Sequence, residues 1–334
     1  MPKKKAFITG LSGQDGSYLA EYLIENDYEV FGMMRRHSDA ESQDKRVVHL
    51  FDKNLMDADY GDLLDPSSLN RLIALFKPDE IYNLAAQSHV RISFDIPQFT
   101  MKTNVVGTLN LLEAYRTICP SAHFYQASSS EMFGNEIDED GYQRESTAMK
   151  PVSPYGCSKL AAYCIVRNYR NSYNLFASNG ILFNHESPRR GANFVTAKIA
   201  RGAAAIKLGL QDSLTLGNLD AYRDWGHAKD YVRAMHKILQ HHEPDEFVIS
   251  SKESHSVRDF CEAAFSHYNM DYKDYVKQDP KFMRPEELKR LKGDSSKSRK
   301  ALNWQPEYDF KSLVSDMVAS WETQLKLESD ANNG

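Results

Sequence analysis

Along the first half of the chain, short apolar runs alternate with longer stretches in which apolar residues recur at helical spacing. The runs predict strands at 5–9, 29–34, 81–84 and 123–127, and the longer stretches predict helices through 18–23 and over 105–115. Strands that alternate with helices are typical of βαβ units, in which the strands lie parallel and crossover helices cover both faces of the sheet. The pattern therefore predicts a parallel sheet between two layers of helices.

The pattern changes past the middle of the chain. A helix over 155–173 and a buried strand over 175–183 continue the alternation, which weakens beyond residue 184. Helices are predicted at 193–208, 227–240 and 257–267, whereas 277–300 is polar and basic. The expected fold class is α/β, a Rossmann-type doubly wound parallel sheet with a smaller C-terminal α/β substrate domain. We place the first domain at 1–184 and the second at 185–334, and allow later segments to return to the first.

The composition is that of an ordinary globular protein. Of the 334 residues, 41% are hydrophobic and 26% are charged, which excludes disordered, collagen-like and coiled-coil chains. No apolar run approaches the roughly 18 residues of a membrane span. The basic start is followed by only a short apolar stretch at 6–8, so we expect neither a membrane anchor nor a secretion signal.

Charge and ligand-forming residues narrow the choice of partners. The net charge of −5 gives no overall field that would attract nucleic acid. The four cysteines form no C-x-x-C pair and the eleven histidines form no ligand cluster, so no metal site is expected. Cysteines without an evident pairing fit a reducing compartment, and we expect a cytoplasmic location.

A Gly-x-x-Gly-x-x-Gly sequence, with Gly10, Gly13 and Gly16, lies between the first predicted strand and the first predicted helix. Glycines there permit a tight turn and a close backbone approach to a pyrophosphate, and the helix N-terminus supplies free N–H donors. Dinucleotide binding is therefore favoured over an incidental turn. Arg35 and Arg36 follow the second strand, where a carboxylate normally holds the ribose of NAD. Guanidinium groups would pair with the 2′-phosphate of NADP. Binding of NADP is therefore favoured over the interpretation that the two arginines are merely solvated.

Two further motifs supply candidate catalytic groups. Tyr155 and Lys159 stand four apart at the start of a predicted helix, so they share one face, where the ammonium can lower the pKa of the phenol. Ser129 and Glu131 follow a predicted strand, at the edge where parallel sheets bind ligands. A hydroxyl there can polarise a substrate oxygen, and a carboxylate can shuttle protons. Either motif alone would suit a solvated surface, and the glycine-rich loop upstream strengthens the catalytic interpretation.

Seven long strings of the sequence carry a resemblance to a known family. From residue 6 to about residue 321, the chain resembles the GDP-mannose 4,6-dehydratase family, within the extended short-chain dehydrogenase/reductase superfamily. The strings are TGLSGQDGSYLAEYL, IYNLAAQSHVRISFD, FYQASSSE, SPYGCSKL, NGILFNHESPRRGANFVT, LGNLDAYRDWGHAKDYV and RPEELKRLKGD. The stretch 184–191 is far more diagnostic of the family than the glycine-rich loop.

The resemblance implies a Rossmann domain with a smaller sugar-nucleotide domain. It also implies conversion of GDP-D-mannose to GDP-4-keto-6-deoxy-D-mannose with NADP, which is a lyase reaction. It gives Tyr155 the role of base at the 4-hydroxyl, with Lys159 as its partner, and gives Glu131 the removal of the proton from carbon 5. Ser129 stands where the family usually has threonine, so this chain keeps the hydroxyl and loses a methyl group.

By the same resemblance, two sets of residues bind the ligands. The cofactor set is Gly10, Gly13, Gln14, Asp15, Arg35, Arg36, Ser38, Asp62, Leu63, Leu84, Ala86, Ser88, Lys159, His185 and Arg190. The set near the GDP-sugar is Ser88, Asn184, Lys198, Arg223, Arg284 and Glu287. Paired cations suit a diphosphate.

Other outcomes stay open at the level of sequence. In the family, tetramers use the loop at 37–45 near the cofactor, and the sequence of this loop departs here from the usual one. From the resemblance we expect a homodimer or a homotetramer. A nucleotide-sugar 4-epimerase would need Tyr155 and Lys159 but not Glu131. A non-catalytic NADP-sensing regulator would not need all four candidate catalytic residues. A side reduction of the keto product to GDP-rhamnose with added NADPH is a further expectation, because NADPH binds beside carbon 4.

Overall fold

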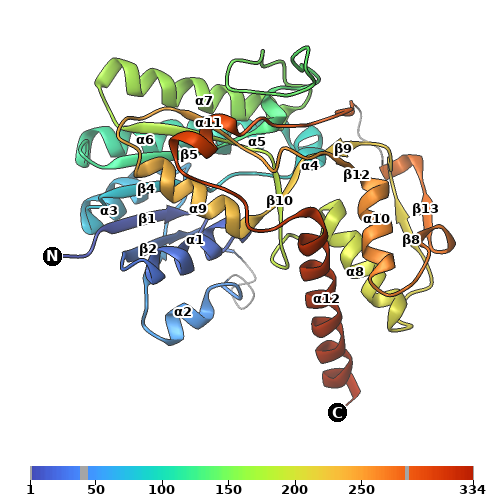
Figure 1. Ribbon diagram of the computed structural model, residues 1–334. Helices are drawn as coiled ribbons and strands as arrows, with labels where there is room; N and C mark the ends of the chain where they lie inside the picture. The colour runs from blue at the N-terminus through green and yellow to red at the C-terminus, as the bar shows by residue number, and fades with distance from the viewer. Residues whose placement is uncertain (1, 38–43, 283–285, 334) are drawn as a thin grey trace.

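The computed structural model describes residues 2–37, 44–282 and 286–333, and a seven-stranded sheet forms its centre (Figure 1). Its strands are β1 (Lys5–Thr9), β2 (Glu29–Met34), β3 (Asp57–Tyr60), β4 (Glu80–Asn83), β5 (His123–Ser129), β6 (Ala177–Leu182) and β11 (Glu246–Ile249). Their spatial order is β11-β6-β5-β4-β1-β2-β3, and every neighbouring pair is parallel. The chain starts in the middle of the sheet, builds one half and crosses back to build the other. This topology confirms the expected doubly wound α/β fold.

Helices cover both faces of this sheet (Figure 1). The α-helices are α1 (Gln14–Glu25), α2 (Val48–Asp52), α3 (Pro66–Phe76), α4 (Val90–Asp95), α5 (Pro97–Met101), α6 (Gly107–Ile118), α7 (Pro154–Tyr173), α8 (Val195–Lys207), α9 (Ala228–Leu239), α10 (Val257–Ser266), α11 (Ser296–Ala301) and α12 (Phe310–Asn333). A π-helical turn, η1 (Lys102–Val106), and the 3₁₀ turns η2 (Ser130–Met132), η3 (Tyr272–Asp274) and η4 (Pro280–Phe282) complete the helical segments. α1 and α9 bury one core against the sheet, and α3, α6 and α7 bury another on the opposite face.

Local sequence fixes the start of α7, the helix that carries two candidate catalytic residues. The Ser153 hydroxyl accepts a hydrogen bond from the Gly156 N–H at 3.0 Å, and Pro154 occupies the first turn, where its missing N–H costs nothing. The helix ends where Asn174 adopts a left-handed conformation, with φ at 52°. These caps place Tyr155 in the first turn, directly beyond the carboxyl end of β5.

A smaller part of the chain has a separate core, formed by α8, α10 and α12 with short strand pairs (Figure 1). The short strands are β7 (Asn184–Glu186), β8 (Leu214–Leu216), β9 (Tyr222–Arg223), β10 (Trp225–His227), β12 (His255–Ser256) and β13 (Val276–Gln278). They pair as β7 with β10, β9 with β12, and β8 with β13. In the capping box of α10, the Ser256 hydroxyl accepts the Asp259 N–H and the Asp259 carboxylate accepts the Ser256 N–H.

The chain returns to the large sheet after it has entered this smaller part. α9 packs against α1, and β11 pairs with β6 as the edge strand. The Trp304 indole, almost fully buried, donates to the Asp230 carbonyl at 2.8 Å and joins a later segment to the start of α9. Residues beyond 184 therefore contribute both to the sheet layer and to the smaller core.

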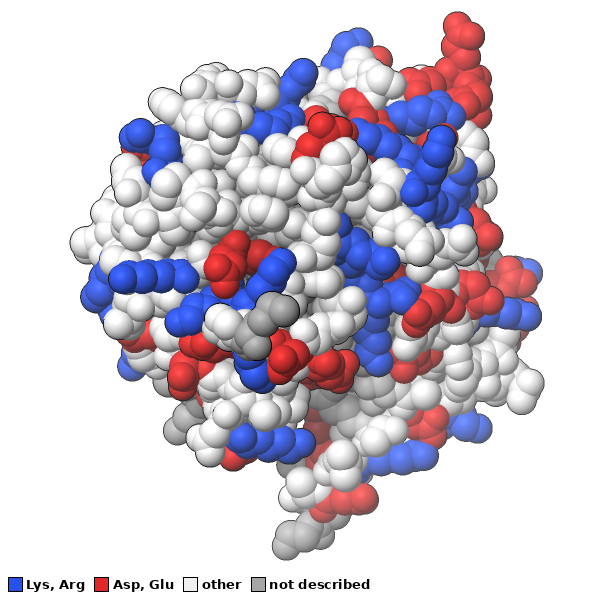
Figure 2. Space-filling view, turned by 60° about the vertical axis from the view of Figure 1, so that its left-hand side comes forward, with Lys and Arg blue, Asp and Glu red and all other residues white. Residues whose placement is uncertain are grey.

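Charged side chains of both signs are interspersed on the face drawn in Figure 2, with a band of Lys and Arg near its middle. The acidic net charge is therefore not spread as one uniform field over that face. Among the described residues, no helix combines the length and the apolar character that a bilayer crossing demands.

Candidate active site

Polar groups gather where the parallel strands end. β1 leads into the glycine-rich loop, β2 into Arg35, β4 into the loop with Leu84 and Ser88, and β5 into Ser129. Because neighbouring strands are parallel, these carboxyl ends meet at one edge of the sheet, which is the edge where doubly wound folds bind their ligands.

The glycine-rich loop brings its backbone unusually close to the neighbouring strand end. Gly10 has a φ of +71°, and a Cβ there would lie 2.9 Å from the Ala85 nitrogen. The Gly13 N–H donates to the Gly10 carbonyl at 3.0 Å and closes the turn that starts α1. Gly13, the N-cap of α1, has no side chain to cap the helix, so the N–H groups of its first turn stay available to a pyrophosphate. The residues at this loop fit a dinucleotide cofactor.

An ion pair joins this loop to the segment after β6. Asp15 Oδ2 lies 2.7 Å from His185 Nε2, and His185 Nδ1 lies 2.8 Å from the Phe183 carbonyl. Although burial opposes both charges, His185 and its neighbours lower the pKa of Asp15, and Asp15 raises the pKa of His185. Gln14 strengthens the link, since its amide donates to Asp15 and its Oε1 accepts from the Ser187 hydroxyl at 2.8 Å.

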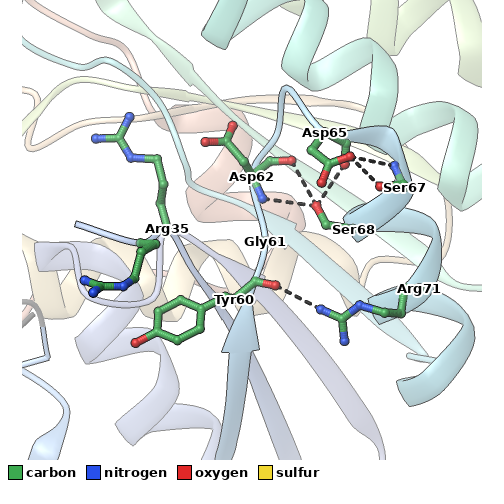
Figure 3. Close-up of a pocket in the computed structure, with 9 residues that line it drawn as sticks. Arg35, Tyr60, Gly61, Asp62, Asp65, Ser67, Ser68 and Arg71 are labelled. Atoms are coloured by element: carbon green, nitrogen blue, oxygen red, sulfur yellow. Dashed lines mark hydrogen bonds between the residues drawn. The ribbon is translucent and has the colours of Figure 1, made fainter. Parts of the chain in front are cut away.

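The end of β2 opens onto a cavity of about 540 Å³ (Figure 3). Its lining residues are Arg35, Arg36, Tyr60, Gly61, Asp62, Asp65, Ser67, Ser68 and Arg71. Asp62 is held in place, because its N–H donates to Ser68 Oγ at 3.2 Å and its carboxylate accepts from the Leu64 N–H at 2.9 Å. The cavity combines exposed guanidinium groups with fixed polar walls, a suitable environment for a phosphate-bearing ligand.

The remaining predicted cofactor residues lie on the same edge. Leu63 is buried, and its carbonyl accepts from the Asn110 amide at 2.9 Å. Leu84 lies in the loop after β4, and its N–H donates to the Thr9 hydroxyl at 3.1 Å. Ala86 and Ser88 follow in that loop, half-buried and exposed respectively.

The four predicted catalytic residues come together in a buried group. Tyr155, Lys159, Ser129 and Glu131 are each less than 10% exposed. Lys159 Nζ donates to the carbonyl of Ala127, at the end of β5, at 2.8 Å. The Ser129 side chain lies near the Tyr155 phenol, and its hydroxyl accepts the Glu131 N–H at 3.2 Å. The phenol, the ammonium, the hydroxyl and the carboxylate thus share one site at the end of β5.

One sequence expectation about this group is wrong. Lys159 was expected to lower the pKa of Tyr155, yet burial raises that pKa to about 12, against a smaller lowering by the Ser129 hydroxyl. Burial also lowers the pKa of Lys159 to about 8, and Asp15 opposes this. Spacing correctly places the two side chains on one face, but it does not reveal the desolvation that both groups experience. Deprotonation of Tyr155 near neutral pH therefore needs additional positive charge close to the phenol.

Two predicted sugar-nucleotide residues, far apart in sequence, form an ion pair. Arg223 is 5% exposed, and its Nη2 lies 2.9 Å from Glu287 Oε1. Its Nη1 donates to the Leu288 carbonyl at 2.9 Å. Lys198 is exposed on α8, with Nζ 5.7 Å from the ring centre of Phe282. This part of the chain therefore offers one buried and one exposed cation to an anionic ligand.

Two other predicted residues lie at β7: Asn184 is its first residue, and Arg190 follows shortly after its end. Asn184 has a buried Oδ1 without a hydrogen-bond partner among the described residues, so a ligand donor can satisfy it. Arg190 Nε lies 2.9 Å from Glu186 Oε2, and its guanidinium stacks 3.6 Å from the ring centre of Phe194. Ser38 and Arg284, which were also predicted, lie outside the described residues.

Sequence reasoning missed a buried residue that supports the site. Asn104, on the π-helical turn η1, donates to Ser158 Oγ at 2.9 Å, and the Ser158 hydroxyl donates to the Tyr155 carbonyl at 2.7 Å. Asn104 Oδ1 also accepts the Gln87 N–H at 2.9 Å. It therefore ties the loop after β4 to the turn that carries Tyr155. The π-helical turn, a feature frequent at functional sites, has no signal in the apolar pattern.

Comparisons with known proteins give matches over nearly the whole chain. The family model for GDP-mannose 4,6 dehydratase matches residues 7–317. The human GDP-mannose 4,6 dehydratase is 49% identical over 342 residues, covering 95% of this chain and 91% of that protein. The Vibrio cholerae GDP-mannose 4,6-dehydratase is 47% identical over 354 residues, covering 96% and 94%.

Solved structures show a similar fold. RMD from Pseudomonas aeruginosa, complexed with NADPH, has a TM-score of 0.80 at 27% identity and covers 96% of this chain and 100% of its own. The dTDP-glucose 4,6-dehydratase of Bacillus anthracis, in complex with NAD, has a TM-score of 0.83 at 22% identity and covers 97% and 98%. Both structures share the fold of this chain over nearly its whole length, and each of them contains a nicotinamide cofactor.

Proposed function

This chain belongs to the GDP-mannose 4,6-dehydratase family, and from that membership we propose how its buried tyrosine, lysine, serine and glutamate act on the sugar. The activity is GDP-mannose 4,6-dehydration, a lyase reaction served by a nicotinamide cofactor. The observation that carries the assignment of residues is the single buried group of Tyr155, Lys159, Ser129 and Glu131 at the end of β5.

The dehydration proceeds through oxidation at carbon 4. Direct loss of hydroxide from carbon 6 is unfavourable, whereas a ketone at carbon 4 makes the carbon 5 proton acidic. A nicotinamide cofactor held by the glycine-rich loop would supply the acceptor for the hydride from carbon 4 and the donor that returns it to carbon 6. The net change is loss of one water.

Each residue has a part in this sequence. Tyr155 removes the proton of the 4-hydroxyl, and Ser129, whose side chain lies near the phenol, donates to the same sugar oxygen. Lys159 binds the ribose of the cofactor, and its ammonium, 5.8 Å from the Tyr155 ring centre, contributes only part of the positive charge that the phenolate needs. Glu131 removes the proton from carbon 5 and delivers it to the hydroxyl that leaves carbon 6 as water. Carbon 5 takes up one proton when the hydride returns to carbon 6, and this balances the proton that Tyr155 took from the 4-hydroxyl.

We propose NADP as the cofactor. Gly10 and Gly13 receive its pyrophosphate, since a Cβ at Gly10 would meet backbone. Arg35 and Arg36 pair with its 2′-phosphate in the cavity at the end of β2. The ion pair of Asp15 and His185 holds the start of α1 against the segment that follows β6.

The smaller part of the chain is proposed to bind GDP-D-mannose. Arg223 and Lys198 face its diphosphate, while Asn184 and Glu287 bond the nucleotide sugar. The division at residue 184, a homo-oligomeric state and a cytoplasmic location remain our predictions from the sequence.

Tyr155→Phe tests the proposed base. This variant loses the phenolic hydroxyl and keeps the ring, so GDP-mannose should bind nearly as before while turnover falls by roughly 10²–10⁴. Formation of the 4-keto product, followed by chromatography of nucleotide sugars, measures the loss. Tyr173→Phe on the same helix is the matched control, because Tyr173 is about half exposed there. Near-normal dehydration by Tyr155→Phe would refute the assignment.

A further inference from the structure

The segment 286–294 lies between two parts of the proposed site. On one side it contacts the β9 region, where Arg223 pairs with Glu287. The Tyr222 N–H donates to the Lys289 carbonyl at 3.0 Å, and the Gly293 N–H donates to the Asp224 carboxylate at 3.2 Å. The residues proposed to bind the nucleotide thus share one hydrogen-bonded unit with this segment.

On its other side, the same segment is hydrogen-bonded to the loop that follows Glu131. Gln143, which is fully buried, is the centre of this contact. Its N–H donates to the Lys292 carbonyl at 2.8 Å, and its carbonyl accepts the Asp294 N–H at 2.9 Å. Its side chain bridges the two segments, because Oε1 accepts the Lys292 N–H at 3.2 Å and Nε2 donates to the Glu136 carbonyl at 2.7 Å.

Apolar packing forms a second connection between the segment and Glu131. Leu288 and Leu291 from the segment are fully buried in one cluster with Met132 and Phe133. Met132 and Phe133 directly follow Glu131 in the chain, and Met132 closes the 3₁₀ turn that contains it. Closely packed side chains transmit small displacements, because a well-packed core resists compression.

We propose that Gln143 is a positioning residue that couples nucleotide binding at the 286–294 segment to the placement of Glu131. The inference rests on the proposed function, since it takes Arg223 and Glu287 as part of the GDP site. A bound GDP group orders the 286–294 segment. The hydrogen bonds of Gln143 to this segment then also restrict the motion of the loop at 134–147. Elimination then proceeds only when the nucleotide is in place, whereas oxidation at carbon 4 depends on Tyr155 and does not need this coupling.

Amide hydrogen exchange on the NADP-loaded protein tests the coupling, with GDP alone as the probe. In the unaltered protein, GDP should slow exchange by about tenfold both in 286–294 and in 134–147. Gln143→Met removes both side-chain bonds and keeps the volume. In this variant the slowing should persist in 286–294 and become clearly weaker in 134–147. Glu139→Gln is the matched control, because Glu139 is an exposed residue of the same loop.

The outcomes separate the coupling from the function on which it rests. Equal slowing of the loop in Gln143→Met and in the unaltered protein would overturn the coupling and leave the GDP site intact. If GDP failed to slow 286–294 in the unaltered protein, the proposed GDP site would be wrong, and the coupling with it. Should Gln143→Met not fold, Asn135→Ala replaces it. That variant removes an exposed bond between the same two segments, from the Lys289 N–H to Asn135 Oδ1 at 3.0 Å.

Single-turnover kinetics give an independent readout. Gln143→Met should slow elimination by about tenfold and leave the rate of cofactor reduction unchanged, so that reduced cofactor accumulates. A residue that merely supports the fold would slow both steps alike, and that result would overturn the proposal.

Discussion

Replacement of Gly10 by alanine tests two properties of glycine in the glycine-rich loop: its tolerance of a positive φ, and the close backbone approach that the absence of a side chain permits. The residue has a φ of +71°, and an added Cβ would lie 2.9 Å from the Ala85 nitrogen and 3.0 Å from the Ala85 Cα. Gly209 has nearly the same φ, +70°, and no atom lies within 4 Å of the position of its Cβ. Gly10→Ala and Gly209→Ala therefore share the backbone strain, and only the first adds a clash with backbone atoms.

The expected magnitudes follow from these contacts. A left-handed conformation costs an alanine about 1–2 kcal/mol, partly offset by about 0.4–1 kcal/mol from the stiffer unfolded chain. Overpacking against backbone adds about 1–3 kcal/mol in Gly10→Ala alone. Relief of the clash must also move the loop, and loss of one charge-assisted bond to the pyrophosphate weakens NADP by about ten- to a hundredfold.

Urea unfolding measures the loss of stability in each variant, and calorimetric titration measures the loss of NADP affinity. We expect Gly209→Ala to lose a little stability and no affinity, and Gly10→Ala to lose more stability together with cofactor affinity. Equal stability losses in the two variants, with equal NADP affinity, would refute the view that Gly10 is required by close approach as well as by φ.

Three other perturbations address the site. Glu131→Gln should allow cofactor reduction but stall elimination, so reduced cofactor should persist in single-turnover absorbance; unaltered turnover would contradict its role at carbon 5. Joint replacement of Arg35 and Arg36 by glutamine should weaken NADP at least about tenfold and hardly affect NAD in calorimetry, whereas equal losses would make the arginines structural. Asp15→Asn should cost about 3 kcal/mol of stability where its pair with His185 is ionised. Because the pKa of Asp15 lies below 3.8 and that of His185 lies above 6.5, both groups are charged between these two pH values. Thermal melts should therefore show the largest loss of stability in that pH range. The loss should shrink as pH rises through the His185 pKa or falls through the Asp15 pKa, and a pH-independent loss would exclude the ion pair as its source.

The sequence predicts those strands that are buried on both faces. β1 and β6 are almost entirely buried, and their sequences, KAFIT and ASNGIL, consist mostly of small and apolar residues. β3 lies at the sheet edge with two of its four residues exposed, and its sequence DADY carries no apolar run. β11 is only four residues long, and its place in the sheet comes from pairing with β6, far away in sequence.

The same distinction applies to the candidate site. The glycine-rich loop and the Tyr155–Lys159 pair are local patterns, and the structure places both as spacing predicts. Asn104 and Gln143 are ordinary polar residues in sequence, because their hydrogen bonds reach partners 54 and 149 residues away. The pKa of Tyr155 depends on burial by the whole fold, which spacing along one helix does not report.

The return of the chain to its large sheet has a consequence for the order of folding. β11 covers the edge of β6, and α9 covers the face of the sheet beside α1, yet both are synthesised after the start of the smaller part. A nascent chain that has emerged only to residue 184 therefore presents β6 as an open edge and an uncovered apolar face, both of which favour aggregation. Completion of the sheet must wait until residue 249 has left the ribosome, so the two parts of this protein mature together during synthesis.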